Sequence, residues 1–205
     1  KSNQAPSKQA SGQTAVKSEH FRAGDGLKSR LRFETESGHI WLDEQRMILV
    51  HAEAMGELRR ELVDSLGRER AKGVLTRMGY ASGVSDAKLA RRLFPNATDS
   101  ELYLIGPQLH NLEGIVNVHP GKFEMGRHRG ICNGEFVWES SYEAGVHLAE
   151  FGVESDSCCW MQVGYATGYT SELFGDFVLY RETECRAKGD AYCRVVSKPV
   201  AQWDN

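Results

Sequence analysis

Cysteines and a glutamate in the last quarter of the chain have the types and spacing of a closed metal site. Cys185 and Cys193 flank a turn at residues 188–190, Glu182 precedes the first of them by three residues, and a third thiolate comes from the adjacent pair at 158–159. Three thiolates and one carboxylate complete the tetrahedral shell of a structural zinc ion and leave no position for a reactive water. The spacing therefore predicts zinc as a structural cofactor.

The residues alone leave part of this prediction open. No Cys-x-x-Cys pair is present, and free cysteines often behave as small buried apolar side chains. Segments 177–180 and 192–196 have the pattern of strands joined by a turn, which would bring Cys185 and Cys193 together. Adjacent side chains rarely point at one ion, so the pattern does not decide between Cys158 and Cys159. Cys132 lies far away in sequence and is expected to bind no metal.

The composition favours a cytoplasmic protein of one large or two small domains. The 205 residues are 40% hydrophobic and 26% charged, and five cysteines are an odd number without a disulfide framework. No apolar run approaches the roughly 18 residues of a membrane span. A net charge of −3 gives no basic stripe, so nucleic acid is a poor candidate partner for this region. Residues 1–23, rich in Ser, Gln, Lys and Ala, are expected to be a flexible extension.

The first half of the chain has a helical pattern with a few short strands. Residues 31–33 and 39–42 are expected to be strands, and the helices are expected at 43–66, 69–80 and 86–93. Gly67 is placed to end the first helix. Its apolar stripe is long enough to suggest a dimer interface and consists of Ile48, Ala52, Met55, Leu58, Leu62 and Leu66.

The second half alternates short strands with two helices. The segments 115–118, 122–125 and 135–138 favour an antiparallel sheet, because Pro120-Gly121 and Asn133-Gly134 interrupt them. Ser140 or Ser141 can cap a helix that runs to about residue 151, and Gly175 can end another over 160–174. The predicted fold class is α+β, with a helical N-terminal part followed by an antiparallel sheet and helices.

Four separate motifs, at residues 40–47 (IWLDEQRM), 69–73 (ERAKG), 106–110 (GPQLH) and 185–190 (CRAKGD), carry a resemblance. Together they resemble the N-terminal sensory region of the XylR, DmpR, PoxR and MopR family of bacterial sigma-54-dependent activators of aromatic catabolism. The resemblance extends from about residue 33 to residue 203. It implies a sensory and dimerisation region at 24–137, a zinc-containing module of the 4-vinyl reductase type at 138–200, and the start of a linker at 201–205.

The resemblance also implies the partners and the metal ligands. The region would form a homodimer, whereas contact with sigma-54 RNA polymerase and DNA would belong to further domains, among them an AAA+ ATPase. The family pattern places the zinc ligands at Cys159, Glu182, Cys185 and Cys193.

Two residues match the effector contacts of the phenol-responsive members, namely His110 and Trp138. An indole N–H can only donate a hydrogen bond, whereas a neutral imidazole can accept one, so the pair complements a phenolic hydroxyl. The family's toluene sensor differs at the position of His110, which favours a phenolic effector. Further positions that the resemblance places around the effector are Tyr103, Phe136, Tyr165, Tyr169 and Tyr180.

The expected function is therefore that of a non-enzymatic sensor, which binds phenol or a related phenolic and relieves repression of an attached ATPase. Benzene, toluene or 2-hydroxybiphenyl are alternative effectors. A zinc-dependent hydrolase or a reductase is a second hypothesis. The complete four-ligand shell and the lack of a nucleotide-binding glycine motif or an obvious nucleophile–base pair count against it. A purely structural dimerisation domain is the third.

Overall fold

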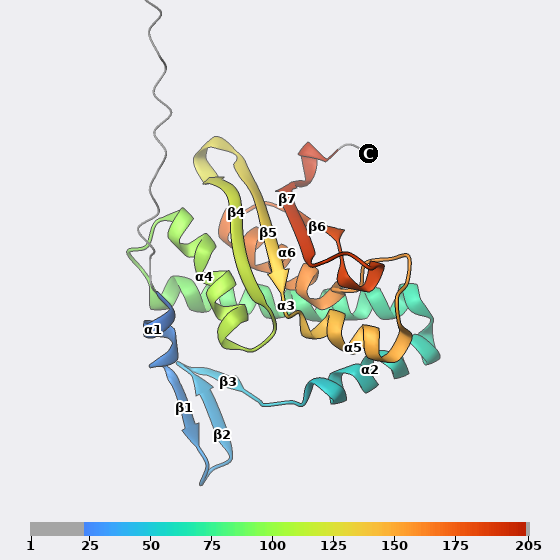
Figure 1. The fold of residues 1–205 in the computed structure, drawn as a ribbon. Helices are drawn as coiled ribbons and strands as arrows, with labels where there is room; N and C mark the ends of the chain where they lie inside the picture. The colour runs from blue at the N-terminus through green and yellow to red at the C-terminus, as the bar shows by residue number, and fades with distance from the viewer. Residues whose placement is uncertain (1–22, 204–205) are drawn as a thin grey trace, which may run out of the picture.

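A small sheet and a short helix open the part of the chain that the structure describes, residues 23–203 of a computed structural model. Helix α1 (Ala23–Lys28) precedes three antiparallel strands, β1 (Leu31–Glu34), β2 (His39–Leu42) and β3 (Gln45–Met47). These strands form a hairpin-like sheet that projects from the main body (Figure 1). The first two strands were expected from the sequence, and the third was not.

The helix expected over residues 43–66 begins nine residues later than predicted. Asp43 has a positive φ of 57° and, with Glu44, makes the tight turn that pairs Leu42 with Gln45 across β2 and β3. Helix α2 (Ala52–Leu66) therefore follows an extended segment. The apolar spacing had joined two separate elements, because positions three and four apart occurred by chance in the strand and its connection.

The helices expected at 69–80 and 86–93 are one continuous helix, α3 (Arg68–Leu93). No helix was predicted for residues 99–112, where the structure has α4 (Asp99–Leu112). Thr98 and Glu101 form a reciprocal capping box at its start, which offsets the unfavourable Gly106-Pro107 pair in its interior. That cap was a sequence signal for a helix at this place.

The main sheet has four antiparallel strands in the order β4-β5-β7-β6. They are β4 (Asn117–Gly126), β5 (Ile131–Glu139), β6 (Val178–Glu184) and β7 (Cys193–Pro199). The two strands expected at 115–118 and 122–125 are a single strand, β4, whose pairing with β5 shifts between Pro120 and Phe123. A proline cannot donate to the ladder, and the irregularity accommodates it at the edge of the sheet.

The two helices predicted in the second half are confirmed. Ser141 accepts a hydrogen bond from the backbone N–H of Ala144 and caps α5 (Tyr142–Phe151), and Gly175 ends α6 (Trp160–Phe174) in the left-handed conformation. Single-turn 3-10 helices complete the described elements, at η1 (Arg127–Arg129), η2 (Arg186–Lys188) and η3 (Val200–Gln202). The predicted α+β class is likewise confirmed.

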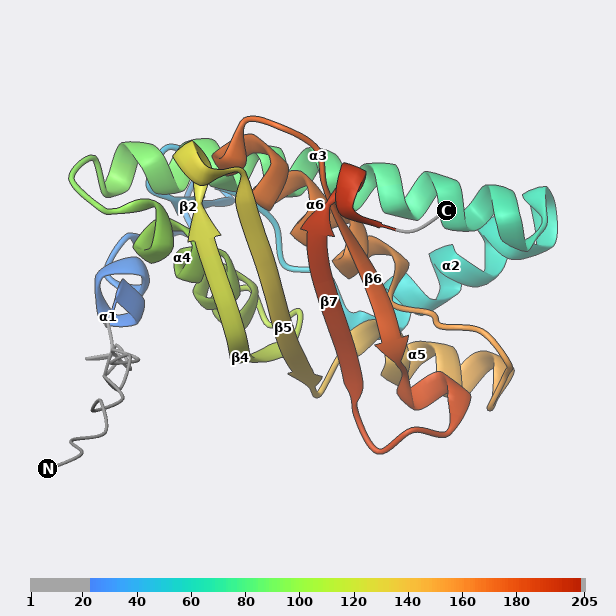
Figure 2. The ribbon, with the colours of Figure 1, turned by 90° about the horizontal axis from the view of Figure 1, so that it is seen from above.

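Helix α6 lies between the main sheet and α3 (Figure 2). Glycines allow the α3 and α6 backbones to touch: a Cβ atom added at Gly79 would lie 1.9 Å from the carbonyl oxygen of Met161, and one at Gly164 would lie 2.1 Å from that of Thr76. Gly83 and Gly168 repeat this contact one turn further along. Across residues 23–203, no helix is both long and apolar enough to cross a membrane.

Candidate functional site

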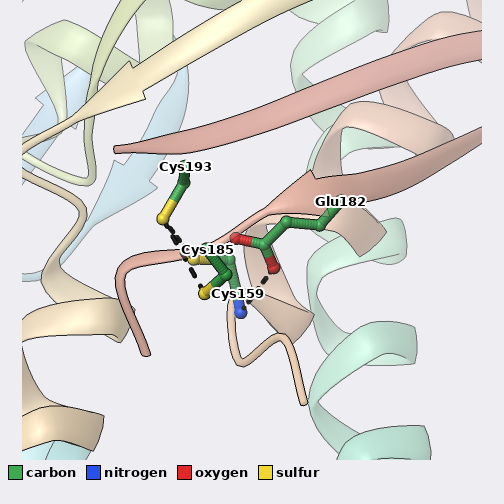
Figure 3. A group of neighbouring side chains, drawn as sticks. All are labelled: Cys159, Glu182, Cys185 and Cys193. Carbon is green, nitrogen blue, oxygen red and sulfur yellow. Dashed lines mark hydrogen bonds between the residues drawn. The ribbon is translucent and has the colours of Figure 1, made fainter. Parts of the chain in front are cut away.

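The predicted metal ligands come together at the edge of the main sheet. Cys159 is the N-cap residue of α6, Glu182 lies on β6, Cys185 follows that strand, and Cys193 begins β7. The turn at residues 186–190 folds Cys185 back towards Cys193, with Gly189 at a φ of 92°. One ligand atom from each residue lies within 4.8 Å of all the others (Figure 3).

The spacing of these atoms fits a tetrahedral ion. The Sγ atom of Cys193 lies 3.7 Å from that of Cys159 and 3.9 Å from that of Cys185. Zinc–sulfur bonds of about 2.3 Å in a tetrahedral shell put neighbouring sulfurs about 3.8 Å apart. Glu182 Oε2 accepts a hydrogen bond of 3.1 Å from the Cys159 N–H, whereas its buried Oε1 has no hydrogen-bond partner among the described residues. That oxygen is free to bind a cation.

The electrostatics of the four-residue cluster also call for a cation. Burial raises the pKa of Glu182 to about 8 and raises the pKa of the Cys159 thiol well above its usual range. Several buried acids cannot ionise together unless a positive charge lies among them. The four residues can therefore hold a divalent metal ion, and three thiolates among the ligands favour zinc or another thiophilic metal.

The two remaining cysteines lie outside this cluster. The Sγ atom of Cys158 is 3.7 Å from that of Cys185, but it faces the carbonyl oxygen of Glu143 at 3.9 Å. The structure thus groups Cys159, rather than its neighbour, with the other three ligands. Cys132 is buried on β5, and burial raises the pKa of its thiol to about 12.

A cavity lies between α4, α6 and the inner face of the main sheet, and all seven predicted effector contacts line it. Including its opening to solvent it encloses about 350 Å³, which is at the lower end of the range for small-molecule sites. The lining consists of Tyr103, Gly106, Pro107, His110, Val118, Phe136, Trp138, Tyr165, Ala166, Tyr169, Thr170 and Tyr180.

The hydroxyl groups in the cavity wall are already engaged with protein atoms. Tyr165 donates to Asp86 Oδ2 and Tyr169 donates to the Leu102 carbonyl oxygen, both at 2.7 Å. The remaining hydroxyls form one hydrogen-bonded group, in which Tyr103 contacts Tyr180 and Ser197 while Thr170 contacts Tyr180. These tyrosines therefore present ring surface rather than free hydroxyls to a ligand.

Two lining residues have unused polar atoms. His110 is 4% exposed and Trp138 is 2% exposed, and within residues 23–203 neither side chain has a hydrogen-bond partner. Burial lowers the pKa of His110 to about 3, so its imidazole is neutral. The cavity thus offers one indole donor and an imidazole with one acceptor and one donor nitrogen. Buried polar groups of this kind are normally paired, which points to a ligand with a hydroxyl.

An acid pair lies directly behind the cavity wall. Asp86 on α3 is fully buried and accepts hydrogen bonds from Tyr165 and from Gln45 Nε2, the latter at 2.9 Å. Glu113, just after α4, donates a third hydrogen bond to the same carboxylate, because burial and the Asp86 charge raise the pKa of Glu113 to about 9. Sequence reasoning missed this pair, since its members are 27 positions apart in the printed sequence and no motif connects them.

Sequence reasoning also missed several lining residues on α4. Gly106 approaches the cavity so closely that a Cβ atom there would lie 2.8 Å from the Tyr169 ring. Together with Pro107, it lies one turn before His110 on a helix that the sequence was not expected to form. The capping box at Thr98 and Glu101 would have revealed that helix, and the spacing of three would then have placed Tyr103, Gly106 and His110 on one helical face.

Two family models match this chain. The model described as "Activator of aromatic catabolism" matches residues 26–126, and that of the 4-vinyl reductase domain matches residues 138–199. The phenol regulator MopR of Acinetobacter guillouiae is 40% identical over 179 residues, which are 87% of this chain and 32% of that protein. The transcriptional regulatory protein XylR of Pseudomonas putida is 40% identical over 177 residues, which are 86% of this chain and 31% of XylR.

A solved structure is similar along most of the chain. The crystal structure of the phenol-responsive sensory domain of the transcription activator PoxR with phenol superposes with a TM-score of 0.88 at 49% sequence identity. The match covers 91% of this chain and 94% of that one. The chain spans about a third of the length of the two curated relatives, both of which are named as regulators rather than enzymes.

Proposed function

Since the chain belongs to the family of activators of aromatic catabolism, we propose that it is the effector-sensing part of such an activator. The proposed effector is phenol or a closely related phenolic, bound in the cavity between α4, α6 and the main sheet. The sensory domain of PoxR, which is 49% identical, binds phenol.

The observation that carries this proposal is the pair of unpartnered polar groups on His110 and Trp138. The other polar side chains of the lining are bonded to protein atoms. A phenol hydroxyl accepts from the Trp138 indole N–H and donates to a ring nitrogen of neutral His110. The aromatic ring then lies among side chains that offer apolar surface, including Phe136, Tyr165 and Tyr169.

The same pairing separates phenol from toluene. An effector without a hydroxyl leaves both polar groups buried and unbonded, at a cost of about 1–3 kcal/mol. The free volume favours a single ring over 2-hydroxybiphenyl, because the cavity is already at the small end for ligand sites. We therefore place phenol and small alkylphenols ahead of benzene, toluene and biphenyls.

We further propose that the ion held by Cys159, Glu182, Cys185 and Cys193 is zinc in a structural role. The four ligands fill a tetrahedral shell, so the metal stabilises the junction of α6 with β6 and β7 and activates no water. This supports the sensor hypothesis over a zinc-dependent hydrolase.

The wider setting follows from the family. We propose a cytoplasmic homodimer with a sensory region at 24–137 and a 4-vinyl reductase-type module at 138–200. In a complete activator, effector binding would relieve repression of an AAA+ ATPase, which acts with sigma-54 RNA polymerase and DNA. Exposed apolar side chains on α2 and the segment before it, among them Leu58, Leu66 and Ile48, support the dimer, since such side chains gain by being covered.

Calorimetric titration of this chain with phenol, 3-methylphenol, toluene and 2-hydroxybiphenyl tests the proposal. We expect saturable binding of both phenols at one site per chain, weaker binding of toluene, and recovery of each ligand unchanged. Equal affinity for phenol and toluene would contradict the role of His110 and Trp138. Conversion of phenol into another compound would favour the enzyme hypothesis.

A further inference from the structure

The cavity around His110 has no cationic side chain in its lining. The residues that line it are aromatic, apolar or hydroxyl-bearing, apart from the imidazole of His110, which burial keeps neutral with a pKa of about 3. An anion that enters this cavity loses its hydration without gaining a positive partner. Trp138 can donate one hydrogen bond, which compensates only a small part of that loss.

A negative charge lies one side chain behind the cavity. The Tyr165 ring contacts the His110 ring, with centroids 3.7 Å apart, and the Tyr165 hydroxyl donates to Asp86. Asp86 receives further hydrogen bonds from Gln45 and from protonated Glu113. Three donors stabilise the carboxylate form of Asp86, whereas Glu113 keeps its proton up to a pKa of about 9. The acid pair therefore carries one negative charge at neutral pH.

Other titratable groups around the cavity do not offset this charge. Arg91 on α3 influences Tyr169 from behind, but its guanidinium donates to the Leu173 carbonyl oxygen at 2.7 Å and does not line the cavity. Cys132, beside Tyr103, stays a neutral thiol because burial raises its pKa to about 12. Burial likewise raises the pKa of each of the four cavity tyrosines, so their hydroxyls remain protonated.

We propose that this cavity accepts only the neutral hydroxyl form of its effector, and that Asp86, held by Glu113, is the residue that rejects the phenolate. This inference rests on the proposed function and narrows its effector class. A phenolate has no proton to give to His110, and it is repelled by the Asp86 carboxylate across a weakly polarisable wall. The recognised class is therefore phenols that are weak acids, and strongly acidic phenols of the same size are excluded.

The decisive experiment is a pH series with ligands of similar size and different acidity. Phenol, whose pKa is about 10 like that of a tyrosine side chain, is compared with 4-cyanophenol and pentafluorophenol by calorimetry between pH 6 and 9. We expect the dissociation constant of phenol to stay nearly level. Those of the acidic phenols should rise about tenfold per pH unit above each ligand's own pKa, because only the neutral fraction binds. Level dissociation constants for all three ligands would overturn the inference.

Asp86→Asn tests the residue assignment, since asparagine keeps an acceptor for Tyr165 and removes the charge. Its matched control is Glu44→Gln, which removes one carboxylate from an exposed position next to Gln45. We expect Asp86→Asn to narrow the ratio of the pentafluorophenol and phenol dissociation constants at pH 7 by about tenfold, and Glu44→Gln to leave it unchanged. An unchanged ratio in a folded Asp86→Asn protein would overturn the assignment to Asp86.

The outcomes also separate this inference from the proposed function. If Asp86→Asn does not fold, the pH series on the unmodified chain decides alone whether the phenolate is excluded. If no phenol binds at any pH, the proposed function itself fails. If neutral and ionised phenols bind equally well, the chain remains a phenol sensor and only the selection of the neutral form is wrong.

Discussion

The ring centroids of His110 and Tyr165 lie 3.7 Å apart, with the two ring planes tilted by 30°. His110 comes from α4 and Tyr165 from α6, so this contact joins the two helices at the cavity. Because Tyr165 is also bonded to Asp86 on α3, the imidazole is held against a side chain that cannot easily rotate. The hydroxyl-binding group of the cavity is therefore fixed before a ligand arrives, which reduces the entropy lost on binding.

Replacing His110 with Phe should weaken phenol binding by about 1–3 kcal/mol, because the phenol proton loses its acceptor. Toluene binding should change much less or improve, since phenylalanine adds apolar surface. Calorimetry with both ligands measures the difference. Trp138→Phe should act in the same direction, because it removes the indole donor and keeps an aromatic wall. Phenol affinity equal to that of the parent in both variants would mean that the hydroxyl is bound elsewhere.

Cys185→Ser and Cys193→Ser should abolish stoichiometric metal binding and lower the melting temperature sharply, because metal binding contributes to folding. The matched control is Cys158→Ala, which removes a buried thiol beside the cluster that is not one of the four ligands. Metal content by mass spectrometry and thermal unfolding report on all three proteins. A metal-free Cys185→Ser protein of full stability would contradict a structural role.

Removing Arg59 should destabilise the fold by about 3–5 kcal/mol, since its loss leaves a buried carboxylate without its cation. Arg59 is 2% exposed, and its Nη2 atom lies 2.5 Å from Glu143 Oε1 and 2.7 Å from the Cys158 carbonyl oxygen. Urea unfolding of Arg59→Met measures the effect. Arg60→Met, on the same helix with exposed ion pairs, should change the free energy of unfolding by less than about 1 kcal/mol. Similar losses in both variants would argue against a specific buried pair.

Glu113→Gln should change how stability depends on pH. The fold raises the pKa of Glu113 from 4.5 to about 9, so protonated Glu113 favours the folded state below about pH 4.5. This contribution is lost progressively as the pH rises towards 9, by up to about 1.4 kcal/mol per pH unit. Glutamine cannot ionise and removes that slope.

Urea unfolding of the parent and Glu113→Gln between pH 5 and 9 tests this sign. The difference between the two free energies of unfolding should move in favour of the variant as the pH rises. Contributions from the metal ligands are common to both proteins and cancel in the difference. Glu124→Gln, an exposed position on β4, serves as the control and should run parallel to the parent. Parallel curves for Glu113→Gln as well would show that its carboxyl is not perturbed.

Local signals in the sequence predicted the elements that have their own caps. Ser141 and Gly175 bound α5 and α6 as expected, and the turn at 188–190 joined Cys185 to Cys193. The metal cluster could be predicted because three of its four ligands lie within 12 consecutive residues, 182–193. The seven effector positions came from family resemblance rather than from any pattern in this chain.

The errors arose where local and long-range terms compete. The two-residue turn at Asp43 and Glu44 ended an apolar periodicity that otherwise continued into α2. Gly106-Pro107 concealed α4, because proline inside a helix is unfavourable unless tertiary packing compensates for it. The contact between Asp86 and Glu113 depends on how α3 meets the end of α4, and no local propensity encodes it.

The glycine contacts between α3 and α6 have a mechanical consequence. Where backbone lies against backbone at Gly79, Gly83, Gly164 and Gly168, no side chain is available to rotate and absorb a displacement. A ligand that pushes on Tyr165 or Tyr169 therefore moves both helices as one stiff body. At 1.5 Å per residue, the 26 residues of α3 make a rod of about 39 Å. Its N-terminal end, packed beside α2, converts a small shift at the cavity into motion at a distant surface.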